Sequence, residues 1–245
     1  MSEAAAVPQR ASRPAVRPTP NQSEPMQLAG VNLVADPAGA LYWPAESVLI
    51  VSDLHLEKAS SYAVRGQMLP PYDTAETLMR LARLVMRYAP RCVIALGDSF
   101  HDGRGPERLT AQSRAGLHAL QSGRDWIWIT GNHDPEPAEG IGGSFGGTLQ
   151  VGALSFRHEP TGAPGEVAGH LHPVARVRHR GQTIARRCFA GDRDRVILPA
   201  FGAFAGGLNV RHEAFGEVFG SHDFTAHMLG DGRIYAFTAT QCLED

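Results

Sequence analysis

The sequence predicts an α/β fold, and three observations support this prediction. In the first half of the chain, apolar runs that are typical of buried strands alternate with amphipathic helices. The second half consists of short strand-like segments and contains no long helix. The chain has 245 residues, of which 43% are hydrophobic, so it can bury a substantial core. We therefore expect a parallel sheet in the first half and a second, more antiparallel sheet in the rest.

Three buried strands and two helices are expected in the first half. The strands are predicted at 48–53, 92–98 and 126–132, where the apolar runs are continuous. A helix is predicted at 73–88, with Asp73 and Glu76 as an approximate capping box. A second helix is predicted at 107–123. Each of the three strands ends in polar residues, and ligands bind outside the carboxyl ends of strands in open α/β sheets.

The second half and the N-terminus differ in character. Further strands are expected at 148–158, 165–179, 182–190, 195–201 and 232–239. Residues 1–25 contain five prolines and almost no large apolar side chain, which predicts a disordered tail. Residues 26–245 are predicted to form a single domain.

Composition excludes several classes of protein. The net charge is −2, so the whole molecule is not a basic nucleic-acid binder, and any attraction to phosphate must be local. Three cysteines without paired spacing argue against a disulfide framework and favour a reducing compartment, for which we expect the cytoplasm. No signal peptide is visible, and no apolar run is long enough for a membrane span.

Histidines, carboxylates and an amide gather at the predicted strand ends. In chain order these residues are Asp53, His55, Asp98, Asn132, His133, His158, His170 and His172. Such a mixture of donors suits first-row divalent metals, and there are too many donors for one ion. Alternation in DLH and HLH predicts that each pair points to one face of an extended segment. The glycines before Asp98, Asn132 and His170 are expected to let the backbone approach the site.

The motifs DLH, GD, GNHD, H and GHLH, in this order over residues 53–172, resemble those of the calcineurin-like metallophosphoesterase superfamily. The resemblance implies a four-layer αββα sandwich of two mixed sheets with a two-metal site at the sheet edges. It also implies the metal ligands: Asp53, His55 and His172 for one ion, Asn132, His158 and His170 for the other, and Asp98 bridging both with a hydroxide. His133 would contact the substrate phosphate and protonate the leaving oxygen. Manganese is the expected metal, and iron, zinc or cobalt are alternatives.

Longer segments resemble a narrower family. SDLHLEK, LGDSFHD and LPAFGAFAGGLN are similar to the bacterial ligase-associated DNA-damage-response endonucleases. This resemblance implies a phosphodiesterase that acts on DNA together with a DNA ligase and a helicase. One departure concerns the position three residues after Asp98, where many superfamily members carry an acidic residue that orients the catalytic histidine. His101 occupies this position here, and Asp102 follows it.

An arginine-rich segment follows the last ligand motif. Arg176, Arg178 and Arg180 alternate, which predicts that they share one strand face and contact a nucleic-acid backbone. A solvated hairpin, with Arg193 and Arg195 paired to neighbouring aspartates, is an equally open alternative.

The function expected from the sequence is therefore that of a two-metal phosphodiesterase that acts on DNA. A hydrolase of small phosphoesters or nucleotide-sugar pyrophosphates is the first alternative. A non-catalytic scaffold is the second, although it should show broken motifs, and here every motif is intact.

Overall fold

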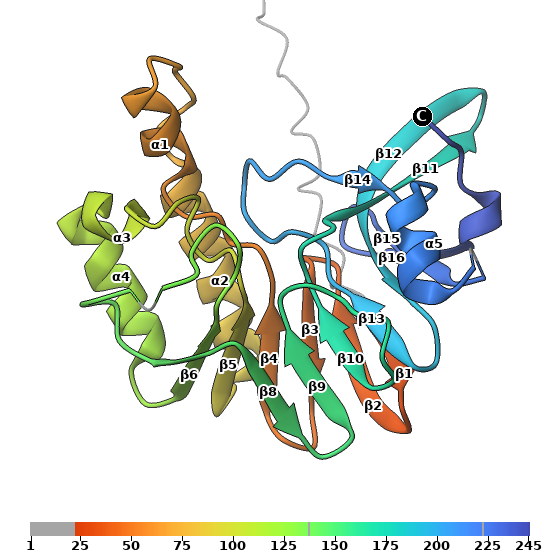
Figure 1. Cartoon of the computed structure of the whole chain (residues 1–245), viewed down its shortest axis with the longest axis horizontal. Coiled ribbons are helices and arrows are strands. Elements are labelled where there is room, and N and C mark those ends of the chain that lie inside the picture. The colour runs from red at the N-terminus through yellow and green to blue at the C-terminus, as the bar shows by residue number, and fades with distance from the viewer. Residues whose placement is uncertain (1–22, 137, 222) are drawn as a thin grey trace, which may run out of the picture.

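The computed structural model describes residues 23–136, 138–221 and 223–245, and it contains two mixed β-sheets (Figure 1). The strands of the first sheet lie side by side in chain order: β1 (Glu24–Leu28), β2 (Val31–Asp36), β3 (Ala40–Trp43), β4 (Val48–Val51), β5 (Cys92–Leu96), β6 (Asp125–Ile129) and β7 (Ser144–Gly146). The pairs from β1 to β4 are antiparallel, and those from β4 to β7 are parallel. The predicted parallel core of the first half is thus confirmed.

The second sheet contains nine strands and is also mixed. They are β8 (Thr148–Val151), β9 (Leu154–Arg157), β10 (Glu166–Ala168), β11 (Pro173–His179), β12 (Gln182–Gly191), β13 (Arg195–Ile197), β14 (Leu208–Asn209), β15 (Thr225–Leu229) and β16 (Ile234–Thr238). Strand β10 is parallel to β9 and β13, whereas β11 and β12 form an antiparallel hairpin.

Five α-helices flank the sheets in the described part of the chain: α1 (Lys58–Val64), α2 (Asp73–Tyr88), α3 (Gly105–Arg108), α4 (Ala111–Gln121) and α5 (Glu213–Phe219). Helix α2 has the predicted bounds, but the predicted capping box is wrong. Tyr72 is the N-cap residue, and the Asp73 carboxylate instead accepts a hydrogen bond from the Ala59 N–H at the start of α1 (2.9 Å). The helix predicted at 107–123 is divided into α3 and α4, because Thr110 leaves the helical conformation and caps α4 through Ser113 N–H.

Successive side chains of the buried strands point to opposite faces of the first sheet, so each strand packs against helices on one face and against the second sheet on the other. In β4, Leu49 and Val51 pack with Leu81 of α2, while Ile50 faces the second sheet and packs in one cluster with Phe156. A third cluster lies on the other face of the second sheet, against α5. Helices α1–α4 and helix α5 therefore lie on opposite sides of the paired sheets (Figure 1). The predicted αββα sandwich is confirmed.

The N-terminal boundary differs from the prediction. Strand β1 begins at Glu24, so Glu24 and Pro25 belong to the fold and not to the tail. Pro25 is tolerated because β1 is an edge strand, where a residue without an N–H can face away from the ladder. Residues 1–22 of the predicted tail lie outside the described residues. Within the described ranges, no helix is long and apolar enough to cross a membrane.

Candidate metal centre

The candidate site forms where the carboxyl ends of β4, β5 and β6 meet the second sheet. Asp53, Asp98 and Asn132 follow these three parallel strands, so they reach the same sheet edge. His158 follows β9, and the GHLH motif lies between β10 and β11 of the second sheet. Both sheets therefore contribute side chains to one site.

One group of donors contains Asp53, His55 and His172. The distance from His172 Nε2 to Asp53 Oδ1 is 3.1 Å, and that from His172 Nε2 to His55 Nε2 is 3.3 Å. Asp53 Oδ1 is buried and accepts no hydrogen bond. Two nitrogen or oxygen ligands at about 2.1 Å from one ion lie about 3.0 Å apart when the angle between them is near 90°. The three donors therefore fit a shared cation.

The second group surrounds His158. Its Nε2 lies 2.9 Å from Asn132 Oδ1, 3.1 Å from His170 Nδ1 and 3.4 Å from Asp98 Oδ1. On the other side of the ring, Nδ1 donates a hydrogen bond to the Leu96 carbonyl (2.9 Å), which leaves the Nε2 lone pair available to a metal ion.

The charges around His158 favour a cation at this position. Burial lowers the pKa of His158, but the hydrogen bond to Asp98 and the charges of Asp53 and Asp98 outweigh it and raise this pKa to about 9. Metal binding requires the neutral imidazole, so a bound ion would displace the proton and take its place beside the two carboxylates.

Asp98 lies between the two groups. Its Oδ1 faces His158 at 3.4 Å, while Oδ2 lies 4.0 Å from His55 Nε2. Burial raises the pKa of the Asp98 carboxyl, but the hydrogen bond and charge of His158 outweigh burial and lower it to about 2. Its two oxygens therefore present negative charge to both groups, as a carboxylate shared by two ions would.

The backbone at these ligands corrects the predicted extended geometry. Asp53, His55, Asp98, His170 and His172 all have positive φ, between 43° and 68°. DLH and HLH are therefore turned segments, because each left-handed residue redirects the chain. The two histidines of HLH point to different groups, His170 to His158 and His172 to Asp53. Such conformations cost on the order of 1–3 kcal/mol each and occur mainly at functional sites.

The predicted role of the three glycines is confirmed. A Cβ on Gly131 would overlap the Asp98 side chain and its backbone nitrogen, and a Cβ on Gly169 would overlap Ser52 and Asp53. A Cβ on Gly97 would lie 2.5 Å from the His158 ring. These positions need glycine because neighbouring ligand segments touch there.

We expect the Gly131→Ala substitution to lower bound metal and phosphodiester hydrolysis together, because the new methyl group displaces Asp98. Gly116→Ala is the matched control, since its Cβ would meet no atom within 4 Å and lies on a helix, where alanine is favoured. Metal analysis and a phosphodiester assay on both variants test this. Full metal content and activity in Gly131→Ala would show that Asp98 tolerates the displacement.

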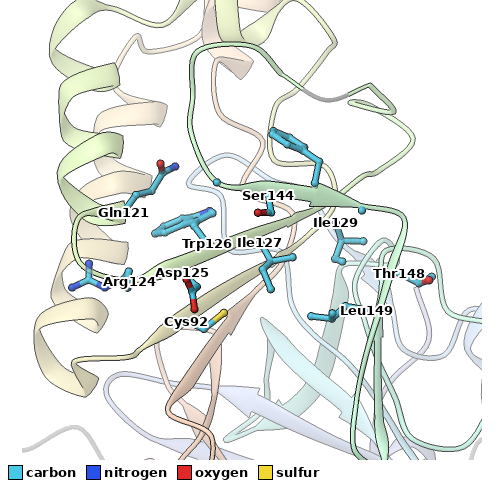
Figure 2. A pocket seen from close by; sticks show the side chains of 13 residues that line it. Cys92, Gln121, Arg124, Asp125, Trp126, Ile127, Ile129, Ser144, Thr148 and Leu149 are labelled. Atoms are coloured by element: carbon cyan, nitrogen blue, oxygen red, sulfur yellow. The ribbon is translucent and has the colours of Figure 1, made fainter.

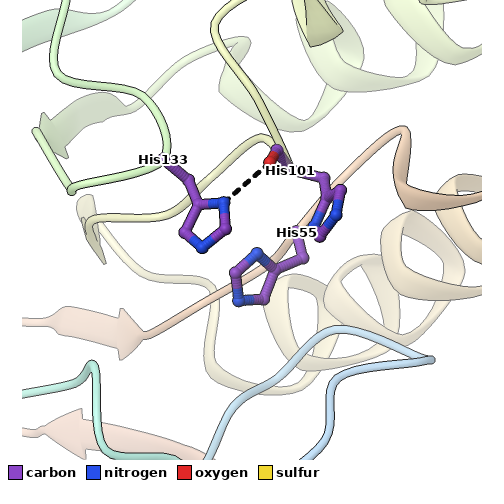
Figure 3. Close-up of side chains that lie close together, drawn as sticks. All are labelled: His55, His101 and His133. Atoms are coloured by element: carbon purple, nitrogen blue, oxygen red, sulfur yellow. Dashed lines mark hydrogen bonds between the residues drawn. The ribbon is translucent and has the colours of Figure 1, made fainter. Parts of the chain in front are cut away.

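His133 lies beside Asp98 and outside these two groups, but it forms a third cluster of possible metal-ligating nitrogens with His55 and His101, within 4.8 Å of one another. Its backbone N–H donates to Asp98 Oδ1 (2.9 Å), and its Nε2 lies 3.9 Å from Asp98 Oδ2. His133 Nδ1 contacts the carbonyl oxygen of His101 at 2.8 Å (Figure 3). A carbonyl can only accept, so it fixes the proton on Nδ1 and directs Nε2 toward the site. The side chain is 39% exposed, which leaves it accessible to a substrate.

Asp102 does not orient His133. Its carboxylate binds Arg108 through two contacts of 2.8 Å and accepts a third hydrogen bond from the Arg104 N–H. The orienting acceptor is therefore the His101 backbone. Asp134, the last residue of GNHD, accepts hydrogen bonds from the N–H groups of Gly131, Ser99 and Phe100, and so joins the GNHD loop to the loop after β5.

Sequence reasoning missed the support that residues 199–207 give to the site. In this loop, Phe201 N–H donates to Ser52 O and Gly202 N–H donates to Asp53 O. The Arg187 guanidinium holds the loop through the carbonyls of Ala200, Ala203 and Ala205. The only signal in the sequence was the resemblance of the LPAFGAFAGGLN segment, which does not reveal the partner arginine.

The arginine-rich segment that follows the last ligand motif is only partly as predicted. Arg176 and Arg178 lie on β11, but Arg180 lies in the turn of the β11–β12 hairpin, where it and Gly181 have φ values of 49° and 79°. Two residues with positive φ are typical of a tight hairpin turn, which ends the alternation. Arg176 forms an ion pair with Asp245 (3.2 Å). The alternative interpretation was a solvated hairpin with arginines paired to neighbouring aspartates. Arg195 forms such ion pairs, with Asp192 and Asp194.

A groove of about 640 Å³ lies along β6 and β7, at the edge of the first sheet (Figure 2). Trp126, Ile127 and Leu149 line it together with Arg124 and Asp125. None of the candidate metal ligands contributes to this groove. The groove is therefore separate from the candidate metal centre around Asp98.

Comparison with known proteins identifies the family of this chain. A model of the calcineurin-like phosphoesterase family matches residues 47–192, which include every candidate ligand. The crystal structure of the Pseudomonas putida nuclease MPE is similar to this chain, with a TM-score of 0.68 and 26% sequence identity, over 88% of this chain and 100% of that one. No curated protein sequence matches the chain. Since the family model covers more than half of the chain, the protein belongs to the calcineurin-like phosphoesterase family and is a metal-dependent phosphoesterase.

Proposed function

We propose that the protein is a two-metal phosphodiesterase that cleaves DNA. The observation that carries this proposal is the pair of donor groups on either side of Asp98, in a chain that resembles a nuclease over nearly its whole length. Asp53, His55 and His172 would hold one ion, and Asn132, His158 and His170 the other. We propose manganese, with iron, zinc or cobalt as alternatives that suit the same donors.

The residues of the chain have separate tasks in this proposal. When bound, two divalent metal ions would stabilise charge on the phosphate and lower the pKa of a water molecule toward neutrality. Asp98 would hold both ions at a fixed separation. His133 would contact the phosphate and, when protonated at Nε2, donate that proton to the leaving oxygen. The carbonyl of His101 keeps the ring in the required orientation.

The setting proposed for this activity is DNA repair in the cytoplasm, together with a DNA ligase and a helicase. The resemblance of SDLHLEK, LGDSFHD and LPAFGAFAGGLN to ligase-associated nucleases supports this setting. The three free cysteines agree with a reducing compartment.

A direct assay tests the proposed substrate. The purified protein, supplemented separately with manganese, iron, zinc or cobalt, would be given single-stranded DNA, nicked duplex DNA, a nucleotide sugar and a phosphomonoester. We expect cleavage of DNA at internal phosphodiesters. Rapid hydrolysis of the nucleotide sugar or the monoester with no attack on DNA would favour the small-molecule alternative.

The free arginines of the hairpin are expected to contact the DNA backbone. Arg178 and Arg180 are exposed and form no ion pair in the described residues, whereas Arg176 is paired with Asp245. Each neutralised phosphate contributes about 0.7–0.9 to the slope of log affinity against log salt concentration. Replacing Arg178 and Arg180 with glutamine should therefore reduce this slope by about 1.4–1.8.

The control for the hairpin is a second pair of exposed arginines, Arg83 on α2 and Arg193 in the turn before β13, changed to glutamine together. This variant has the same loss of charge elsewhere on the surface. DNA affinity over a salt series would be measured for both double variants. Equal slopes in the two variants would mean that the hairpin is a solvated surface.

A further inference from the structure

We propose that Tyr62, His101 and Lys58 form a subsite that binds the nucleoside next to the scissile phosphate. We call these three residues the flanking subsite. The inference rests on the proposed function, and it adds the position at which one unpaired base of the substrate is held.

A continuous row of rings leads outward from the metal centre. The ring centroids of His133 and His101 lie 5.3 Å apart with 29° between their planes, and His101 packs against His55 at 5.6 Å (Figure 3). Tyr62 of α1 continues the row, with its ring 5.5 Å from His101. Because His133 would protonate the leaving oxygen, this row extends on the side where the departing nucleoside lies.

His101 offers an unused polar atom within this row. Its Nδ1 is buried and has no hydrogen-bond partner. A histidine ring nitrogen can take part in one hydrogen bond, so this atom can pair with a polar group of the substrate. A buried polar atom without a partner is costly, and a hydrogen-bonding group of the substrate would satisfy it.

Lys58 supplies charge complementarity at the outer end. Its ammonium group donates to the Phe204 carbonyl (2.9 Å) and lies 5.9 Å from the Tyr62 ring centroid. No carboxylate in the described part of the chain lies within ion-pair distance of Lys58. A cation without an ion-pair partner beside an aromatic ring is a combination that proteins use to hold a base together with its phosphate. These features point to a nucleoside phosphate as the occupant.

The test replaces Tyr62 with leucine, which removes the ring and keeps an apolar side chain. The readout is the ratio of kcat/KM for a short single-stranded oligonucleotide to kcat/KM for methyl 4-nitrophenyl phosphate, which carries no base. We expect this ratio to fall by roughly 10- to 100-fold, the usual effect of losing one base–aromatic stack. Tyr62→Phe, which keeps the ring, should retain the ratio. Tyr235→Leu, which changes an exposed tyrosine on β16, should also retain the ratio.

Oligonucleotides with a single abasic residue locate the base. An abasic residue at the position held by Tyr62 should lower wild-type cleavage and abolish the difference between wild type and Tyr62→Leu. An unchanged ratio in Tyr62→Leu, or an equal loss with the small diester, would overturn the subsite. If the wild-type protein cleaves the small diester and no DNA, the proposed function itself fails. Cleavage of DNA with an unchanged ratio in Tyr62→Leu refutes the subsite alone.

Discussion

Replacing Asp98 with asparagine is expected to reduce bound metal and to lower phosphodiester hydrolysis by at least about a thousandfold, since metal ions contribute several kcal/mol of charge stabilisation. The substitution keeps the shape of the side chain but removes its charge from a buried position, 3% exposed, between the two donor groups. Asp53 and His158 would each help to bind one of the two cations. Without the negative charge of Asp98, the repulsion between these cations would be less compensated.

Elemental analysis and a phosphodiester assay on the same preparation measure both effects. Asp125→Asn is the matched control, because it removes an exposed carboxylate at the start of β6, remote from the carboxyl end of that strand. It should keep the wild-type metal content and rate. Two equivalents of metal in active Asp98→Asn protein would contradict the bridging role of Asp98.

The parallel core and the convergence of the candidate ligands could be predicted because both follow from local patterns. Continuous apolar runs at β4, β5 and β6 indicate strands that are buried on both faces, and parallel strands bring their carboxyl ends together. Polar residues just after such strands, among them Asp53 and Asp98, must then converge. No detail of tertiary structure was needed for this step.

The division of the ligands between the two groups could not be derived from spacing. An alternating pair such as HLH indicates one face only if the segment is extended, and His170 and His172 instead adopt left-handed conformations. Loops also approach one another closely here, since a Cβ on Gly169 would overlap Ser52. The resemblance to the superfamily supplied the assignment that periodicity could not.

Hydrogen bonds to backbone carbonyls could not be predicted from the sequence either. The partner of His133 is the backbone carbonyl of His101. Every residue type has this carbonyl, so the residue at position 101 does not reveal the hydrogen bond. The break between α3 and α4 and the anchoring of residues 199–207 by Arg187 are similar cases. Each depends on which segments the fold places side by side.

The His133→Ala substitution should separate proton transfer from metal binding. His133 is not among the ligands proposed for either ion, and its Nε2 lies 3.9 Å from Asp98 Oδ2, so its removal should leave the bound metal unchanged. We expect cleavage of DNA to fall by roughly 10²–10⁴-fold, the usual contribution of a general acid. His118→Ala, an exposed histidine on α4, is the control and should retain the wild-type rate.

The leaving group decides whether His133 acts as the acid. A nucleoside alkoxide is a strong base and needs a proton as it departs, whereas 4-nitrophenolate leaves readily without one. The loss in His133→Ala should therefore be large for DNA and much smaller for bis(4-nitrophenyl) phosphate, with kcat/KM measured for both at saturating metal. An equal loss with the two substrates would assign His133 to phosphate binding alone. The proton on the leaving oxygen would then have to come from a group other than His133.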